Sequence, residues 1–206
     1  MTPEIKICGI TNLADALLAV ELGADALGFI FYRQSKRYIA PALVADISRV
    51  LPPFVTKVGV FVNESEAGIK QALTACRLDV VQLHGDELPD FCRKFPVKVI
   101  KAIRVRDESS LGAATEYDVD AILLDTYTSS ERGGTGMTFD WTLAKKATKL
   151  LKPRIILSGG LTPENVGEAI RQVQPYAVDV ASGVESEPGR KDTEKLRRFF
   201  KECKIN

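Results

Sequence analysis

The stretch RIILSGGLTPENVGEAIRQV, residues 154–173, contains one complete strand–loop–helix unit. Residues 154–158 form an apolar, β-branched run, as expected for a strand buried on both faces. Two glycines follow, and residues 163–173 then show a helical pattern. Thr162 is the expected N-cap and Pro163 the expected first helical residue, because the fixed φ of proline suits that position. The stretch predicts a buried strand that opens into a glycine loop ahead of a helix.

Similar units recur along the whole chain. We expect further strands at residues 5–8, 26–31, 56–62, 80–83, 97–105, 121–125 and 177–181. Helical patterns occupy residues 13–22, 41–51, 64–76, 140–151 and 193–204, with weaker ones at 87–94 and 108–117. Eight such units in 206 residues predict an α/β fold, a single (β/α)8 TIM barrel domain over residues 1–206. The rival, an open doubly wound sheet, normally has G-x-G-x-x-G after its first strand, whereas KICGITN supplies one glycine.

A weak internal repeat places an aspartate just before or within alternate strands. These residues are Asp25, Asp79, Asp120 and Asp179. An aspartate before a strand can cap the preceding turn, so we expect a structural role for the first three. The pattern favours a repeated double strand–helix unit.

Composition excludes several classes of partner and site. The formal net charge is +1, from 28 basic and 27 acidic side chains, which predicts no nucleic-acid or membrane partner. The four cysteines and one histidine are scattered, so we expect neither a metal site nor disulfides. The chain lacks a signal-peptide pattern and any apolar run near the roughly 18 residues that span a bilayer. We expect a cytoplasmic protein.

Polar or glycine residues close most of the apolar runs. In a TIM barrel these carboxyl ends meet at one rim, where active sites lie. After strand seven, Gly159 and Gly160 allow backbone N–H groups to approach an anion, and the following helix start favours negative charge. After strand eight, Ser182 and Gly183 begin a segment that can form the short extra helix of a phosphate site. The pair of loops predicts a phosphate site, although two ordinary turns are the alternative.

Asp125 ends the apolar run AILLD, and the glycine-rich segment after it offers no nearby helix for it to cap. We therefore expect a functional carboxyl group there. Gly133, Gly134 and Gly136 in the segment suggest a mobile lid, with Arg132 as a solvated charge on it.

Two further rim residues have open interpretations. His84 is either an ordinary polar group at a strand end or a substrate contact. Arg37 is either a plain exposed charge or a guanidinium that binds a carboxylate through two hydrogen bonds.

Together, the motifs KICGIT, GFIFYRQSKRYI, VGVFVN, VVQLHG, LLDT, GGTGMTFDW, LSGGLTPENV and DVASGVESEPGRKD resemble the phosphoribosylanthranilate isomerase family of tryptophan biosynthesis. The resemblance runs in order from residue 6 to about residue 192. It implies a cofactor-independent Amadori rearrangement of N-(5-phosphoribosyl)anthranilate to 1-(2-carboxyphenylamino)-1-deoxyribulose 5-phosphate. The family occurs as monomers or homodimers, and the sequence does not decide between them.

The resemblance also implies roles for individual residues. Cys8 is the general base, Asp125 the general acid, and Asp179 assists them. Arg37 holds the anthranilate carboxylate. The remaining implied residues are Gln82 and His84 as substrate contacts and Gly159, Gly160, Ser182 and Gly183 as phosphate ligands.

A catalytic thiol raises a chemical difficulty, because an ordinary cysteine has a pKa of about 8.5 and is mostly protonated at neutral pH. Strand alternation puts Lys6 and Cys8 on one face. We hypothesise that Lys6 points into the barrel, favours the Cys8 thiolate and is balanced by Asp179; the alternative is that Lys6 points outward. Cys76, Cys92 and Cys203 fall in helical patterns and are expected to have no catalytic role.

Two other functions stay open on the sequence. One is another aminoaldose-phosphate isomerase of the same barrel class, and the other is a phosphate-ligand binding barrel without catalytic activity. The combination of Cys8 with Asp125 argues against the second.

Overall fold

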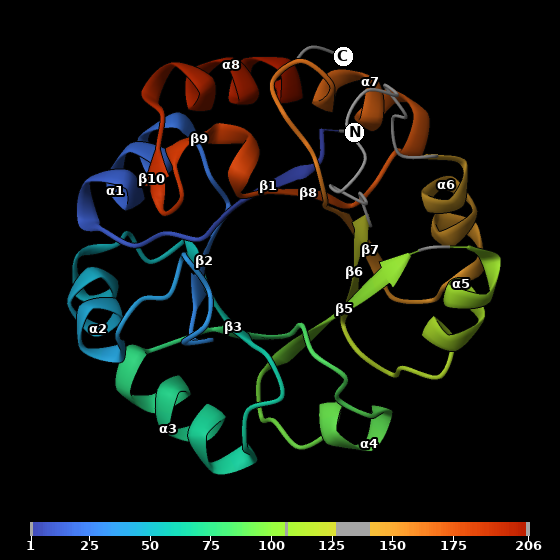
Figure 1. The fold of residues 1–206 in the computed structure, drawn as a ribbon, viewed down its shortest axis with the longest axis horizontal. Helices are drawn as coiled ribbons and strands as arrows, with labels where there is room; N and C mark the ends of the chain where they lie inside the picture. Colours follow the sequence, from blue (N-terminus) through green and yellow to red (C-terminus); the bar gives the residue numbers. More distant parts are fainter. Residues whose placement is uncertain (1, 106, 127–140, 205–206) are drawn as a thin grey trace.

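The computed structural model describes residues 2–105, 107–126 and 141–204. Eight parallel strands close into a barrel in chain order, with β1 paired to β8, and the helices surround them (Figure 1). The predicted TIM barrel is confirmed. The strands are β1 Glu4–Cys8, β2 Ala26–Ile30, β3 Thr56–Phe61, β4 Val80–Leu83, β5 Lys98–Val105, β6 Ala121–Thr126, β7 Arg154–Leu157 and β8 Ala177–Val180. The helices are α1 Leu13–Leu22, α2 Pro41–Val50, α3 Glu66–Cys76, α4 Pro89–Cys92, α5 Glu108–Ala114, α6 Trp141–Leu150, α7 Val166–Val173 and α8 Thr193–Lys204.

Local chemistry explains where several helices begin and end. The side chain of Asn12 accepts a hydrogen bond from the Asp15 N–H at the start of α1, and Gly23 ends that helix in the left-handed conformation. Ser65 and Asp107 cap α3 and α5 in the same way as Asn12. These caps satisfy N–H groups that a helix leaves without a partner, so they fix the points at which chain direction changes.

Two apolar clusters stabilise the barrel. The larger cluster lies between the strands and the surrounding helices and includes Phe29, Phe61 and Phe199. The smaller one fills the barrel interior with side chains from β3 to β8. Its buried members are Val58, Val80, Ile100, Ala102, Ala121, Leu123, Ile156 and Ala177. This apolar interior lies beneath the carboxyl ends of the strands.

The aspartates that precede β2, β4 and β6 are structural, as expected, but they do not cap the turns before them. Asp25 accepts the backbone N–H of Ile5 at 2.8 Å. Asp79 and Asp120 accept the N–H groups of Lys57 and Val99 in the equivalent way. Each carboxylate therefore binds the start of the strand that precedes its own, and the repeated double unit has a physical basis.

The expected start of α7 is wrong. Thr162 and Pro163 precede the helix, which begins at Val166 with Asn165 as N-cap. The Asn165 side chain accepts the Thr162 N–H at 2.8 Å, and the Thr162 hydroxyl accepts the Glu164 N–H at 3.2 Å. These bonds close a separate turn, so the helix starts at Val166 instead of Pro163.

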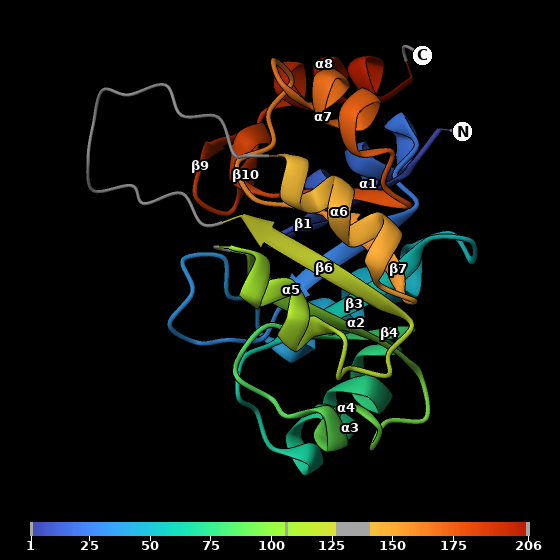
Figure 2. The ribbon, with the colours of Figure 1, turned by 90° about the vertical axis from the view of Figure 1, so that its right-hand side faces the viewer.

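A short segment after β8 closes one side of the rim. A 3-10 helix, η1 Ser182–Val184, leads into the two-stranded hairpin of β9 Glu185–Glu187 and β10 Arg190–Lys191. The expected short helix after strand eight is thus present, although the hairpin is not predicted by the sequence. Figure 2 places this hairpin on the side toward which the β6 arrow points, which is the carboxyl-terminal rim.

Candidate active site

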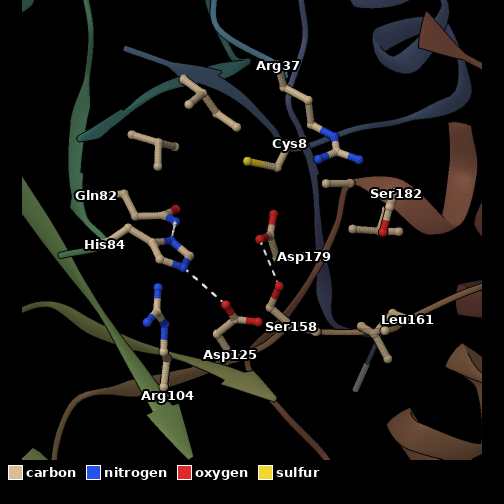
Figure 3. A pocket seen from close by; sticks show the side chains of 16 residues that line it. Cys8, Arg37, Gln82, His84, Arg104, Asp125, Ser158, Leu161, Asp179 and Ser182 are labelled. Atoms are coloured by element: carbon tan, nitrogen blue, oxygen red, sulfur yellow. Dashed lines mark hydrogen bonds and ion pairs between the residues drawn. The ribbon is translucent and has the colours of Figure 1, made fainter. Parts of the chain in front are cut away.

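A cavity of about 400 Å³ opens at the carboxyl ends of the strands (Figure 3). Most of the residues singled out from the sequence line it. They are Cys8, Arg37, Gln82, His84, Asp125, Gly159, Gly160, Asp179 and Ser182. Gly183 and Lys6 do not line it, but both pack directly beneath residues that do. The Cys8 thiol and the Asp125 carboxyl enter the space from opposite sides, which is the arrangement that a paired proton acceptor and donor require.

The Cys8 thiol is buried beside a strand position that has no side chain. Cys8 pairs with Gly28 on β2, where a Cβ atom would lie 2.7 Å from Sγ. Burial raises the pKa of the Cys8 thiol, while the positive charges of Lys6 and Lys191 oppose that rise. The net direction is upward, so Lys6 limits the cost of forming the thiolate without reversing it.

Lys6 points into the barrel, and its Nζ donates to Asp179 Oδ1 at 2.8 Å. Burial lowers the pKa of Lys6, but Asp179 and Cys8 together outweigh burial and the pKa is raised, which keeps the ammonium charged. The other Asp179 oxygen accepts the Ser158 hydroxyl at 3.1 Å. The expected inward orientation of Lys6 and its pairing with Asp179 are confirmed, and the effect of Lys6 on the thiolate stays a prediction.

That prediction has a direct measurement. Replacing Lys6 by methionine is expected to move alkylation of Cys8 to higher pH, because the largest opposing charge is removed. Site-resolved mass spectrometry separates this thiol from Cys76, Cys92 and Cys203. An unchanged pH midpoint for Cys8 alkylation would reject the hypothesis. The variant should also lose about 3–5 kcal/mol of stability, because Asp179 is left buried without its partner.

Asp125 belongs to a hydrogen-bonded chain that begins on β4. His84 Nε2 lies 3.2 Å from Asp125 Oδ2, and Gln82 Nε2 lies 3.0 Å from His84 Nδ1. A neutral imidazole that carries its proton on Nε2 satisfies both contacts, since it then donates to Asp125 and accepts from Gln82. The chain fixes one oxygen of Asp125 and leaves the other facing the cavity (Figure 3).

The loops after β7 and β8 meet at one corner of the cavity. Gly159 and Gly160 have φ values of 80° and 66°, which glycine adopts without steric penalty. A Cβ atom on Gly183 would lie 1.8 Å from the Leu161 carbonyl oxygen, so only glycine permits this close packing. Glycine residues and a serine hydroxyl at one corner form the kind of surface that binds phosphate.

Arg37 is not a free surface charge. Its Nε and Nη2 atoms donate to the carboxylate of Glu185, the shortest contact being 2.6 Å. Glu185 also binds Lys191 at 3.1 Å, and Lys191 donates to the Cys8 carbonyl at 2.6 Å. This buried ionic cluster ties the hairpin after β8 to the end of β1, and it leaves Nη1 of Arg37 for a further acceptor.

Three further expectations from the sequence concern a lid, a metal site and a membrane-spanning segment. The suggested lid with Arg132, Gly133, Gly134 and Gly136 lies outside the described residues. Among the described residues, no three His, Cys, Asp or Glu side chains gather as a metal ion would need. Within the same ranges, none of the helices is both long and apolar enough to cross a membrane.

Comparison with known proteins assigns this geometry to a family. Residues 5–202 match the N-(5'-phosphoribosyl)anthranilate (PRA) isomerase family. The chain belongs to this family. An N-(5'-phosphoribosyl)anthranilate isomerase from Trichlorobacter lovleyi is 55% identical over 201 residues, which cover 98% of each chain. The phosphoribosyl anthranilate isomerase crystal structure from Thermotoga maritima is 50% identical, covers 98% of both chains and superposes with a TM-score of 0.90.

A second solved structure, of a phosphoribosyl anthranilate isomerase with reduced 1-(o-carboxyphenylamino)-1-deoxyribulose 5-phosphate, gives a TM-score of 0.88 at 46% identity over 98% of each chain. The family resemblance expected from the motifs is confirmed. Asp125, Cys8 and the two loops thus lie in the rim cavity of a phosphoribosylanthranilate isomerase fold.

Sequence reasoning assigned no specific role to three residues that line this isomerase cavity or hold it together. Arg104 pairs with Asp125 in the β5–β6 register and reaches the cavity from the exposed end of β5. Ser158 binds Asp179, and Lys191 connects β1 to the hairpin. For Arg104, the available signal was its place near the carboxyl end of β5, where a charged side chain can reach the rim. Nothing local marks Lys191 as buried.

Proposed function

We propose that this protein, in the cytoplasm, converts N-(5'-phosphoribosyl)anthranilate to 1-(2-carboxyphenylamino)-1-deoxyribulose 5-phosphate in tryptophan biosynthesis. The observation that carries the proposal is the single cavity that brings Cys8 and Asp125 together beside the paired glycine loops. Family membership supports it independently. Proton transfers suffice for the rearrangement, so no cofactor is part of the proposal.

The proposed chemistry proceeds in balanced steps. Asp125 gives a proton to the ribose ring oxygen while the C1–O bond breaks, and the nitrogen lone pair forms a protonated Schiff base. Cys8 takes the proton from C2, whose bonding electrons form the C1=C2 bond as the C=N electrons return to nitrogen. The enolamine becomes the ketone when C1 gains a proton and the 2-hydroxyl loses one. Exchange with solvent then restores Cys8 and Asp125, with Asp179 holding Lys6 beneath the thiol.

The two charged ends of the substrate are assigned to different walls. Gly159, Gly160, Ser182 and Gly183 form the proposed phosphate site. Arg37 is proposed to bind the anthranilate carboxylate through Nη1, the guanidinium nitrogen that does not donate to Glu185. Glu185 holds the guanidinium still, which lowers the entropy lost when the carboxylate binds.

Replacing Gly183 by alanine tests the phosphate site. The added Cβ would lie 1.8 Å from the Leu161 oxygen and force the two loops apart. We expect KM to rise about 10- to 100-fold, the equivalent of one hydrogen bond to a charged group. Gly112→Ala in α5 is the matched control, because a Cβ there meets nothing within 4 Å. Equal KM values for both variants would remove Gly183 from the site.

A kinetic assay of the purified protein tests the proposed function itself. Turnover of N-(5'-phosphoribosyl)anthranilate is the expected result. Activity on another aminoaldose phosphate, without activity on this substrate, would select the alternative isomerase. Tight binding of the substrate without turnover at high protein concentration would instead favour a binding protein.

A second copy of this chain is the proposed macromolecular partner. One related solved structure, 46% identical, derives from a phosphoribosylanthranilate isomerase of Thermotoga maritima that is described as dimeric. In this chain Phe54 is 96% exposed and borders a second cavity of about 460 Å³ at the amino-terminal end of the barrel. An aromatic ring this exposed stabilises a protein more when a partner covers it.

Phe54→Glu is expected to convert a homodimer into a monomer, because a buried glutamate would have to lose its hydration. Sedimentation equilibrium measures the mass directly. Leu88→Glu is the control, since Leu88 is also exposed, at 72%, but follows β4 near the opposite rim. A dimer that persists in Phe54→Glu would contradict this interface.

A further inference from the structure

Gln82 on β4 has a buried oxygen atom that the protein does not satisfy. The residue is 1% exposed and lines the rim cavity. Its Nε2 atom is bound to His84, whereas Oε1 has no hydrogen-bond partner among the described residues. A buried carbonyl left without a donor destabilises the folded protein. Such a cost is expected where a ligand supplies the missing donor.

The orientation of the Gln82 amide is fixed by its neighbours. His84 Nε2 lies 3.2 Å from Asp125 Oδ2, and when the acid proton of Asp125 sits on its other, cavity-facing oxygen, the imidazole proton belongs on Nε2 and Nδ1 is left as an acceptor. The Gln82 group that faces Nδ1 must then be its NH2 group, which places Oε1 toward the cavity (Figure 3). Turning the amide around would bring two acceptors together at 3.0 Å.

The position of β4 indicates which part of the substrate Oε1 meets. In the closed order of strands, β4 lies opposite β8, and the proposed phosphate ligands follow β7 and β8. Cys8 on β1 and Asp125 on β6 approach from the walls between them. In the substrate, the anilinic nitrogen and the phosphate lie on opposite sides of the reacting carbons. If the phosphate occupies the β7–β8 corner, the anilinic nitrogen therefore points toward Gln82.

We propose that Gln82 Oε1 accepts a hydrogen bond from the anilinic N–H of the substrate and stabilises the positive charge that this nitrogen gains as the ribose ring opens. This inference rests on the proposed function, to which it adds the atom that stabilises the protonated Schiff base. Breaking the C1–O bond turns a neutral N–H donor into a charged one, and hydrogen bonds to charged groups are about twice as strong as neutral ones. The contact therefore favours the Schiff base over the bound substrate, which is the condition for faster chemistry.

A neutral acceptor suits this step better than a carboxylate. The Schiff base has to keep its proton, because the positive nitrogen makes the C2 proton acidic enough for Cys8 to remove. A carboxylate at the same place would compete for the N–H proton, whereas an amide oxygen is far too weak a base to take it. Gln82 can stabilise the charge without discharging it.

Gln82→Met tests the inference, because methionine keeps the volume and removes the oxygen. We expect kcat to fall about 10- to 100-fold, with the shape of the pH profile unchanged. Affinity for reduced 1-(o-carboxyphenylamino)-1-deoxyribulose 5-phosphate should fall by much less than kcat, because the anilinic nitrogen of this compound is uncharged. Gln172→Met, the same change on the exposed face of α7, is the control for the substitution and should leave both quantities unaltered.

Several results would overturn the inference. Equal losses in kcat and in affinity for the reduced compound would indicate a contact that does not depend on the charge of the anilinic nitrogen. A displaced pH profile would indicate that Gln82 acts through His84 and Asp125 as a positioning residue. Unchanged kcat in Gln82→Met, with an active wild type, would refute the contact alone, whereas an inactive wild type would refute the proposed function.

If Gln82→Met folds poorly, a crystal structure of the wild-type protein with the same reduced compound decides the point. The inference requires Oε1 to lie about 2.7–3.2 Å from the anilinic nitrogen. An Oε1 atom bonded to a ribose hydroxyl instead, or to no substrate atom, would refute it.

Discussion

Replacing Cys8 by alanine is expected to lower kcat by about 10²–10⁴-fold, the usual contribution of a positioned general base. No other thiol lies in the rim cavity, among the residues that the structure describes, to replace it. KM should change little, because the proposed substrate contacts at both charged ends are intact. Stopped-flow or steady-state turnover at saturating substrate provides the measurement.

The pH dependence of the wild type gives a second expected result. A base works in its deprotonated form, and burial raises the pKa of the Cys8 thiol. Because thiolate increases as pH rises toward that pKa, kcat/KM should increase with pH on the neutral-to-alkaline side. Cys8→Ala should lack this increase. A variant that keeps the wild-type profile would show that another group abstracts the C2 proton.

Cys203→Ala is the matched control for the loss of a buried thiol. Burial raises the pKa of Cys203 to about 12, and the residue lies in α8, outside the lining of the rim cavity. Its replacement should reduce stability slightly and leave kcat unchanged. The contrast between the two cysteines separates the chemistry of the thiol from the packing of a small apolar side chain.

Strand periodicity carried much of the information about the site. In a closed parallel barrel, a side chain two residues before Cys8 points the same way as Cys8, so the sequence favoured an inward Lys6 on the condition that Cys8 itself points inward. Lys6 lies beside Asp179 because β1 pairs with β8, and these two strands are neighbours only because the barrel closes. The gathering of candidate site residues at strand ends was predictable for a related reason, because the fold brings those ends to one rim.

Contacts made by irregular segments were not predictable in this way. Arg37 looked like a free guanidinium, yet Glu185 of the hairpin after β8 binds it, and no periodic pattern connects the two positions. The start of α7 was misplaced because Asn165 and Thr162 use their side chains to close a turn that competes with the first helical turn. Side-chain hydrogen bonds in loops depend on three-dimensional neighbours that local spacing does not encode.

Asp125→Asn is expected to reduce kcat by about 10²–10⁴-fold, because asparagine has no proton to give to the ring oxygen. The substitution preserves the geometry, since the asparagine oxygen can still accept the hydrogen bond from His84 Nε2 that Asp125 accepts at 3.2 Å. Affinity for the reduced product analogue should therefore stay near the wild-type value while turnover collapses. Ring opening precedes C2 deprotonation, so the variant should also fail to exchange the C2 proton of the substrate with solvent.

Asp120→Asn, the same change at the residue just before β6, provides the control. Asp120 lies just before the start of β6, where its carboxylate accepts the Val99 N–H at 2.9 Å, away from the rim cavity. Its replacement should affect the free energy of unfolding and leave kcat unchanged. If Asp125→Asn retained both turnover and C2 proton exchange, ring opening would not require this carboxyl group. The acid would then have to be sought among the other groups that border the cavity, with His84 first because it already lies beside Asp125.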